Sequence, residues 1–215
     1  MTTQHLKLYH AAGSPNSRRV RMFLAEKGID LALLAVDLGE KEQHGEAYRR
    51  INPRRVVPTL VLEDGTAIGE VPAIQRYLDL RFPELPLMGT NALEQGTIAM
   101  WDRRMEQDGF AAVMEAIRNA APGLKERALA GPHDYAQIPA LAERSRVRVR
   151  HFFEDLDLRL QEVSFVAGDN HSVADITALA AVDFAAKAIN VGVPEELTAL
   201  RRWHASMAAR PSAAA

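Results

Sequence analysis

Residues 6–28 read LKLYHAAGSPNSRRVRMFLAEKG, an apolar strand followed by a small polar turn and a helix. Apolar side chains recur at helical spacing over residues 18–27, and Gly28 then supplies a helix stop. The first N–H groups of a helix have no partner within the helix, so a turn rich in serine at this point is suited to holding an anion. The rest of the chain is organised around this unit of strand, turn and helix.

The rest of the first half alternates short strands with helices. The expected elements are a strand at residues 31–36, a short helix or ordered loop at 40–51, a strand at 56–62 interrupted by proline, a hairpin through Asp64-Gly65 to Ala67-Ile68, and a helix at 72–82. A mixed four-stranded sheet buries these helices economically. We therefore expect a thioredoxin-like α+β domain over residues 1–83.

The second half reads as a separate, all-helical domain. Residues 84–91, ELPLMGTN, lack periodicity and indicate a linker, and the helical domain is expected over 92–215. Its main helices are expected at residues 93–120, 138–161, 172–189 and 194–209. Ser172 and Asp175 are three residues apart before an apolar run, which predicts a capping box rather than a catalytic pair.

Composition excludes several classes of function. The formal net charge is −2, so no excess of basic residues indicates nucleic acid or an anionic membrane as a partner. The chain has no cysteine, which rules out disulfides and any redox thiol of its own, so sulfur chemistry requires a ligand's sulfur. The seven histidines lack metal-ligand spacing, so we expect no metal. Without a signal sequence or a run of 18 apolar residues, the chain is expected to be cytoplasmic.

Five segments together resemble the cytosolic glutathione S-transferases, particularly bacterial members that use a serine near the first helix. They are, in chain order, SPNSRRV, NPRRVVPTL, EVPAIQRYL, FVAGDNHSVADIT and LRRWHASMAARP. The resemblance implies a thioredoxin-like domain that binds glutathione and a helical domain that provides the pocket for a small hydrophobic electrophile. It also implies a homodimer and a role in detoxification, with glutathione as co-substrate.

The resemblance makes Ser14 the expected donor of a hydrogen bond to the glutathione thiolate. Ser17 and Asn16 are alternates. A serine at the position of Ser17 more often satisfies backbone N–H groups at the helix start, and the Asn16 amide could donate in the same way as a hydroxyl. Tyr9 is a further hydroxyl, but its place within the strand favours packing. Since a thiol has a pKa of about 8.5, lowering it by about two units makes the thiolate the major form at pH 7.

The remaining glutathione contacts are expected from two loops. The family pattern implies a cis bond between Val57 and Pro58, which leaves the Val57 backbone to pair with the cysteinyl part of glutathione; a trans proline at a strand edge is the alternative. Arg55 and Gln43 are expected to reach the glycyl carboxylate.

Glu70 and Val71 are expected at the γ-glutamyl end of glutathione, with Glu70 on the ammonium group. Similar transferases carry serine where this chain has Val71, so only the Val71 N–H remains for the carboxylate. A lost hydrogen bond to a charged group costs roughly 1.5–3 kcal/mol. Weaker glutathione binding is therefore expected.

For the electrophile pocket we expect Trp101, Arg104 and Met105, on the helix after the linker. Two other functions remain open: a non-catalytic binding or interaction protein on the same fold, for which Val71 is the best argument, and a glutathione-dependent isomerase, lyase or dehalogenase. Unlike a transferase, the non-catalytic protein would not turn over glutathione, and an isomerase would regenerate it.

Overall fold

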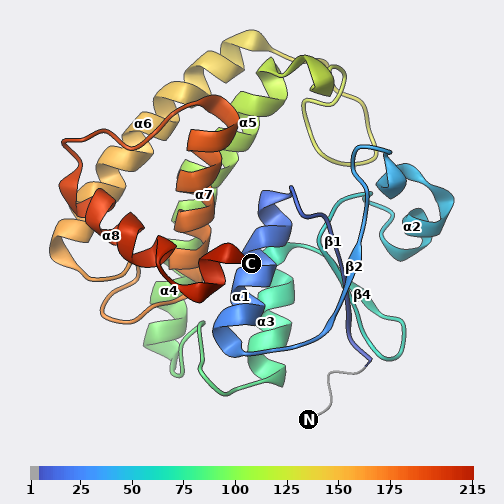
Figure 1. Ribbon diagram of the computed structural model, residues 1–215, viewed down its shortest axis with the longest axis horizontal. Helices are drawn as coiled ribbons and strands as arrows, with labels where there is room; N and C mark the ends of the chain where they lie inside the picture. The colour runs from blue at the N-terminus through green and yellow to red at the C-terminus, as the bar shows by residue number, and fades with distance from the viewer. Residues whose placement is uncertain (1–4) are drawn as a thin grey trace. The chain divides into compact units, whose positions relative to one another are not determined.

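The computed structural model describes residues 5–215, and the chain forms two compact units (Figure 1). The first contains the residues up to Leu85 together with residues 130–133 and Ala215, and the second contains residues 86–129 and 134–214.

The first unit is a four-stranded mixed sheet with helices, as predicted. Its elements are β1 (Lys7–His10), α1 (Pro15–Lys27), β2 (Ala32–Ala35), the 3-10 helix η1 (Glu42–His44), α2 (Glu46–Ile51), β3 (Thr59–Val61), β4 (Ala67–Ile68) and α3 (Val71–Arg81). The strand order is β2-β1-β3-β4, with β1 parallel to β2 and the other two pairs antiparallel. Helices α1 and α3 lie side by side on one face of the sheet, and α2 lies on the other (Figure 1).

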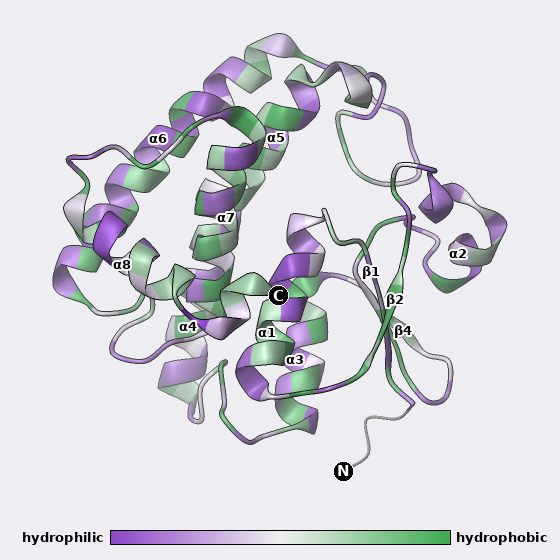
Figure 2. Cartoon of the chain, in the orientation of Figure 1, coloured by the Kyte–Doolittle hydropathy of each residue, from purple (hydrophilic) through white to green (hydrophobic). Residues whose placement is uncertain are grey.

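Helix α1 begins at Pro15, three residues earlier than the apolar spacing predicted. Ser14 is its N-cap and Pro15 occupies the first turn, where a missing N–H costs nothing. Gly28 adopts φ +61° and ends the helix, as expected of a left-handed cap. Hydrophilic and hydrophobic residues alternate around α1 and α3 (Figure 2), and the apolar side chains of α1 are buried, among them Val20 and Phe23.

The second unit is helical, as predicted. Its elements are α4 (Ala92–Arg104), the π-helix η2 (Met105–Phe110), α5 (Ala111–Ala120), the 3-10 helix η3 (Pro122–Leu124), α6 (Pro139–Glu162), α7 (Val173–Ile189), α8 (Thr198–Ala208) and the 3-10 helix η4 (Pro211–Ala214). Helix α7 packs against α4, η2, α5 and α8, so most of its surface is buried. This explains its alanine-rich composition, because small side chains allow neighbouring helices to approach on several sides.

The predicted single helix at residues 93–120 was wrong in one respect, because the π-helix η2 interrupts it. The side chain of Arg148 donates to the Gln107 carbonyl at 2.8 Å and so satisfies a backbone group within the wider turn. At Gly109, an added Cβ would lie 2.5–2.7 Å from ring atoms of Phe152 on α6. The break therefore depends on partners about 40 residues away in sequence, which helical periodicity cannot reveal.

We expect Gly109→Ala to destabilise the protein by about 1–3 kcal/mol, because the new methyl group would overpack the Phe152 ring. Alanine ordinarily favours a helix over glycine by about 1 kcal/mol, so the predicted sign is opposite to helix propensity. Chemical denaturation measures the change. Gly96→Ala in α4 is the matched control: nothing lies within 4 Å of an added Cβ there. It should stabilise by roughly 0.5–1 kcal/mol, and equal effects at both glycines would contradict the overpacking.

Helix α8 was predicted from residue 194 but begins at Thr198. Residues 194–197 form turns, in which Leu197 N–H donates to Pro194 O and Thr198 N–H to Glu196 O. Asp157 of α6 accepts a hydrogen bond from the Leu200 N–H at 2.8 Å, within the first turn of α8. A residue distant in sequence thus supplies the cap that marks this helix start.

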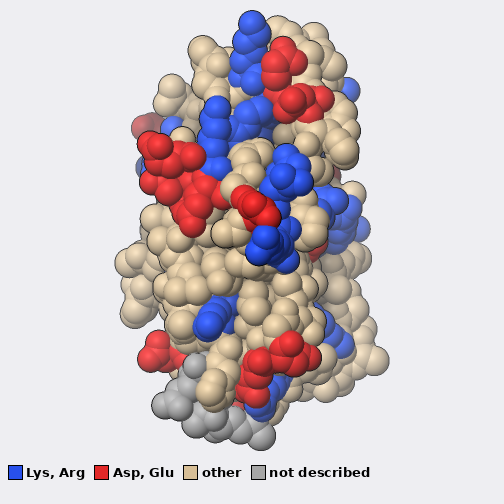
Figure 3. Space-filling view, turned by 90° about the vertical axis from the view of Figure 1, so that its right-hand side faces the viewer, with Lys and Arg blue, Asp and Glu red and all other residues tan. Residues whose placement is uncertain are grey.

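Two general observations bear on partners. None of the helices in the described part of the chain is long and apolar enough to cross a membrane. The face seen in Figure 3 carries basic and acidic side chains in interspersed groups, so it lacks the continuous basic surface that a phosphate backbone requires.

Candidate functional site

Ser14 lies at the junction between the polar turn and α1. Its Oγ accepts a hydrogen bond from the Ser17 N–H at 3.3 Å, and its carbonyl accepts from the Arg18 N–H at 2.9 Å. The residue is 9% exposed. Since the cap uses a lone pair of Oγ, the hydroxyl proton stays available to donate, and no acceptor for it lies among residues 5–215. Ser14 is therefore both the helix cap and a hydrogen-bond donor at the helix N-terminus.

Two side chains of α1 reach back to fasten the turn that precedes Ser14. The Ser17 Oγ accepts from the Ala11 N–H at 3.2 Å, and Ser17 is fully buried. Arg21 donates to the carbonyls of Ala11, at 3.3 Å, and Ala12, at 3.2 Å. Arg21 also lies 3.3 Å from His10 Nδ1, and burial, then the Arg21 charge, lower the pKa of His10. Ser17, an alternate for the thiolate contact, thus holds the turn from within.

Asn16, the other alternate, uses its side-chain oxygen to accept from Arg19 at 3.2 Å. Tyr9 packs its ring edge-on against Tyr48, with centroids 6.0 Å apart, in agreement with the packing role expected for it. Of the four candidate polar side chains, Ser14 is the one whose hydroxyl lies at the helix cap.

The Val57–Pro58 bond is cis, as predicted. Neither the Val57 N–H nor its C=O makes a hydrogen bond to any residue from 5 to 215. Val57 is 8% exposed. A buried backbone amide without a partner is rare, so this loop has the free donor and acceptor that an extended peptide ligand requires.

The preceding carbonyl, of Val56, is in contrast heavily bonded. It accepts from the Tyr48 hydroxyl at 2.7 Å, from the Asn52 amide at 3.1 Å and from the Thr59 hydroxyl at 3.4 Å. These three side chains were not expected as site residues from the sequence. They are separated by 4, 7 and 11 residues, a spacing that matches no single helix or strand. The one signal in the sequence is that polar side chains flank an apolar loop.

Arg55 and Gln43 each carry a buried polar atom without a partner in the described chain. For Arg55 it is the guanidinium Nε, and for Gln43, which is 3% exposed, it is the amide Oε1. Arg55 also has φ +55°, a left-handed backbone. A half-buried guanidinium with an unused donor fits an anionic ligand, since orphaned donors cost free energy that a carboxylate recovers.

Glu70 has a strained backbone, with φ +63° and ψ 125°, immediately before α3. Such conformations cost roughly 1–3 kcal/mol in a residue other than glycine and are concentrated at ligand sites. The Glu70 carboxylate is exposed and lies 3.5 Å from Arg54. Val71 is 4% exposed, and its N–H, the first of α3, has no partner in residues 5–215. Within residues 5–215, the first unit thus offers a hydroxyl without an acceptor at the start of α1 and N–H groups without a partner at the start of α3 and in the Val57 loop.

The residues expected for the electrophile lie in the second unit. The Trp101 ring has two guanidinium groups over it, from Arg104 at 4.8 Å and from Arg159 at 4.6 Å. Met105 is 4% exposed at the first position of η2. Trp101 and Arg104 therefore contact each other, and Arg159 is a third member that the sequence did not indicate, because it belongs to α6.

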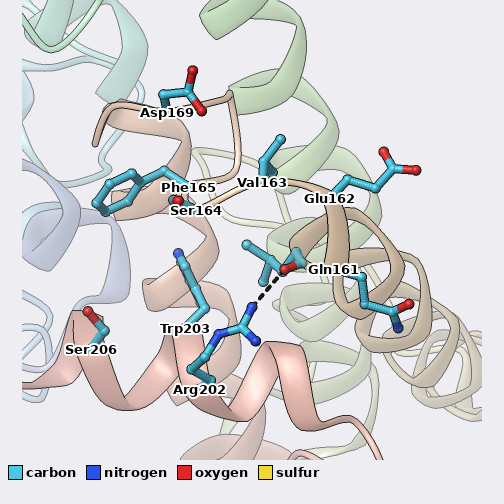
Figure 4. A pocket seen from close by; sticks show the side chains of 10 residues that line it. Gln161, Glu162, Val163, Ser164, Phe165, Asp169, Arg202, Trp203 and Ser206 are labelled. Atoms are coloured by element: carbon cyan, nitrogen blue, oxygen red, sulfur yellow. Dashed lines mark hydrogen bonds between the residues drawn. The ribbon is translucent and has the colours of Figure 1, made fainter.

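A cavity of about 480 Å³ also lies within the second unit, between the end of α6, residues 163–169 and α8 (Figure 4). Arg202 projects beside it and donates to the Leu160 carbonyl at 2.9 Å. No residue predicted for glutathione or for the electrophile lines it. Across residues 5–215 there is no group of three or more His, Asp or Glu side chains able to hold a metal ion.

Comparison with known proteins gives a family for the chain. Residues 8–86 match the family model of the glutathione S-transferase N-terminal domain, and residues 106–211 match that of the C-terminal domain. Glutathione S-transferase 2 of Saccharomyces cerevisiae is 35% identical over 97% of this chain and 88% of its own length. A glutathione S-transferase domain-containing protein of Marinobacter aquaeolei has a structure with a TM-score of 0.89 and 36% identity, covering 96% of this chain and 98% of that one.

A second enzyme type matches over half the chain. Maleylacetoacetate isomerase of Pseudomonas aeruginosa is 36% identical over 51% of this chain and 48% of its own length. The two family models and the near full-length match to the yeast transferase agree with the motifs and with the two-unit architecture. The chain belongs to the glutathione S-transferase family of enzymes.

Proposed function

We propose that this protein is a glutathione transferase in which the Ser14 hydroxyl stabilises the glutathione thiolate for attack on a small hydrophobic electrophile. The observation that carries the proposal is the Ser14 hydroxyl at the N-cap of α1. Its oxygen accepts from the Ser17 N–H, and its O–H has no acceptor within residues 5–215. A hydroxyl held in this way donates toward an anion at the helix N-terminus.

The energetic requirement is modest. Lowering a thiol pKa by two units corresponds to about 2.7 kcal/mol of preference for the thiolate. A hydrogen bond to a charged group and a helix N-terminus supply on the order of 1 kcal/mol or more each. The protein has no cysteine, so the sulfur nucleophile comes from the co-substrate. In this proposal the protein binds, orients and stabilises that sulfur.

The remaining glutathione contacts follow from the free groups in the first unit. Val57 would pair through its backbone with the cysteinyl part, and the unused Arg55 Nε would bind a carboxylate. Gln43 would donate to the same carboxylate through its amide NH2 group, since its unpartnered Oε1 is an acceptor. At the other end the Val71 N–H would bind the second carboxylate and Glu70 the ammonium group. Trp101, Arg104 and Met105 would face the electrophile.

The direct test of the function is binding and turnover by the wild-type protein. Calorimetry should detect glutathione at micromolar to millimolar concentration, and an aryl halide should be converted to its glutathione conjugate. Absence of binding at millimolar glutathione would contradict the proposal and favour a non-catalytic binding or interaction protein on the same fold.

Ser14→Ala should raise the pKa of bound glutathione, read from the pH dependence of kcat/KM, and lower turnover near pH 6.5 by on the order of ten-fold or more. The reason is loss of the hydroxyl donor at the sulfur. The same change removes the α1 cap, so the protein should also lose about 1 kcal/mol of stability.

Two variants separate these effects. Asn91 caps α4 in the same way, accepting from the Glu94 N–H at 3.0 Å. Asn91→Ala should cost similar stability without moving the thiol pKa. Ser17→Ala tests the alternate: if it raises the thiol pKa and Ser14→Ala does not, Ser14 has been assigned the wrong role.

A glutathione-dependent isomerase is the second candidate, favoured by the match to maleylacetoacetate isomerase. It would use the same thiolate on an unsaturated acceptor and regenerate glutathione. Product analysis distinguishes the two, because a transferase consumes one glutathione per turnover and an isomerase consumes none.

We also propose that the protein acts as a homodimer and that detoxification of electrophiles in the cytoplasm is its role. The support for a dimer is the family and an apolar face on α4, where Leu93 is 79% exposed and Met100, two turns later, is 43% exposed. Light scattering that gives the mass of one chain would contradict it.

A further inference from the structure

The peptide between Val56 and Val57 is held from one side only. Its carbonyl accepts three hydrogen bonds, while its N–H, on Val57, makes none within residues 5–215. The Val57–Pro58 bond is the only cis peptide in the described chain, so the Val56–Val57 peptide is trans. In a planar trans peptide the C=O and N–H point in opposite directions. Whatever fixes the Val56 carbonyl therefore also sets the direction of the Val57 N–H.

Three side chains converge on that carbonyl and bond to one another. Besides their contacts to Val56 O, the Tyr48 hydroxyl lies 3.0 Å from Thr59 Oγ1, and Asn52 Nδ2 lies 2.9 Å from the same atom. We call Tyr48, Asn52 and Thr59 the carbonyl clamp. The shortest bond to the carbonyl, at 2.7 Å, comes from Tyr48.

The clamp is rigidly seated. Asn52 is 7% exposed and Thr59 is 1% exposed. Asn52 also accepts from the Arg54 N–H at 3.0 Å through its side chain, and from the Arg55 N–H at 2.9 Å through its carbonyl. Buried polar networks in which each member is bonded specify one geometry, because any alternative leaves a polar atom unsatisfied.

Tyr48 also links the loop to the turn before Ser14. It is 3% exposed and belongs to a buried cluster with Ala11, Val36 and Val57. Its ring meets Tyr9 of β1 edge-on, at 6.0 Å between centroids. Burial raises the pKa of Tyr48, so its hydroxyl keeps its proton and remains a donor at neutral pH.

We propose that Tyr48 is a positioning residue for ligand binding: through the Val56 carbonyl, its hydroxyl aims the Val57 N–H at the main chain of the bound peptide co-substrate. This rests on the proposed function, because it assumes that the ligand of this loop is glutathione. Tyr48 does not touch the ligand in this scheme. It removes the freedom of one peptide plane, and a preorganised donor binds without a further ordering cost.

The test compares Tyr48→Phe with the wild type by calorimetry with glutathione and by steady-state kinetics. Phenylalanine keeps the ring packing and removes only the hydroxyl. We expect glutathione affinity to fall on the order of five- to ten-fold, while kcat at saturating glutathione and the KM of the electrophile stay within about two-fold. Thr59→Val should weaken glutathione similarly, and the double variant should lose less than the product of the two factors, because both act on one carbonyl.

Tyr77→Phe on α3 is the matched control, since the Tyr77 hydroxyl has no hydrogen-bond partner in residues 5–215. It should bind glutathione as the wild type does. A folded Tyr48→Phe protein with wild-type glutathione affinity overturns the proposal, and so does a loss in which kcat and the electrophile KM change as much as affinity. Should Tyr48→Phe not fold, Thr59→Val decides by the same criteria. Failure of the wild type to bind glutathione is a different result, which removes the proposed function itself.

Discussion

Asp175→Ala is expected to lower the free energy of unfolding by about 3–5 kcal/mol. The carboxylate is fully buried, and its two oxygens accept from the Val166 N–H at 2.9 Å, the Ser172 N–H at 3.0 Å and the Trp203 indole N–H at 3.0 Å. Alanine leaves these three buried donors unsatisfied, at roughly 1–3 kcal/mol each before relaxation. It also breaks the capping box of α7, which the sequence predicted and the structure confirms. Urea denaturation measures the loss.

Asp169→Ala is the matched control, because this exposed carboxylate lies six residues away and makes no hydrogen bond to residues 5–215. Its effect should stay within about 0.5 kcal/mol. If Asp175→Ala changed stability by no more than Asp169→Ala, the carboxylate would not be the anchor of this region.

The pH dependence gives a second readout on Asp175. Burial raises the pKa of its carboxyl to about 6, against the opposing effect of the N–H donors. The pKa of Asp175 is higher in the folded protein than in the unfolded chain. Between about pH 4 and 6, the folded protein therefore still holds a proton that the unfolded chain has lost. The contribution of this group to stability therefore falls as pH rises through that window, by roughly 3 kcal/mol. The stability difference between the wild type and Asp175→Asn should decline across the same window and be level above it.

Asp79→Ala is expected to cost about 3–5 kcal/mol as well, because it leaves an ammonium group buried without its counter-ion. Lys27 Nζ lies 2.7 Å from Asp79 Oδ1 and donates to the Leu85 carbonyl at 3.1 Å. The Lys27 side chain is 0% exposed and that of Asp79 is 8% exposed. The pair joins the end of α1 to α3, so thermal and urea unfolding should both report its loss.

Replacing both partners distinguishes an orphaned charge from a poorly packed site. Lys27→Met with Asp79→Leu should recover most of the stability lost in Asp79→Ala, since a buried ion pair is often no more stabilising than apolar residues of similar size. The exposed pair of Glu46 and Arg50 on α2 is the control. Glu46→Ala should change stability by less than about 1 kcal/mol, and an equally small effect of Asp79→Ala would contradict the burial argument.

Local features of this chain were readable because their causes lie within a few residues. Gly28 ends α1, Ser172 and Asp175 cap α7, and the Asp64-Gly65 pair turns β3 into β4. Each depends on backbone groups next to it in sequence, so the residue type carries the information. The role proposed for Ser14 came instead from the family resemblance, because the local pattern alone does not distinguish a thiolate donor from a helix cap.

The features that were missed depend on partners far along the chain. The π-helix η2 depends on Phe152 and Arg148 of α6, and the start of α8 depends on Asp157. The pairing of Lys27 with Asp79 spans 52 residues. Helical periodicity reports only on residues that are neighbours in sequence and assumes a regular helix. It therefore cannot predict a contact with an aromatic ring or a guanidinium group of another element.

The sequence by itself determined the succession of strands and helices and the serine turn, because hydrophobic period, capping residues and turn residues act locally. The cis bond at Pro58 was expected from the family resemblance alone. Only the tertiary structure decided which groups are left free to bind. Within residues 5–215 the Val57 N–H has no partner and the Val56 carbonyl has three, although the two belong to one peptide between like residues. That difference arises from the packing of α2 and β3 around the loop, which places Tyr48, Asn52 and Thr59 on one side of a single peptide plane.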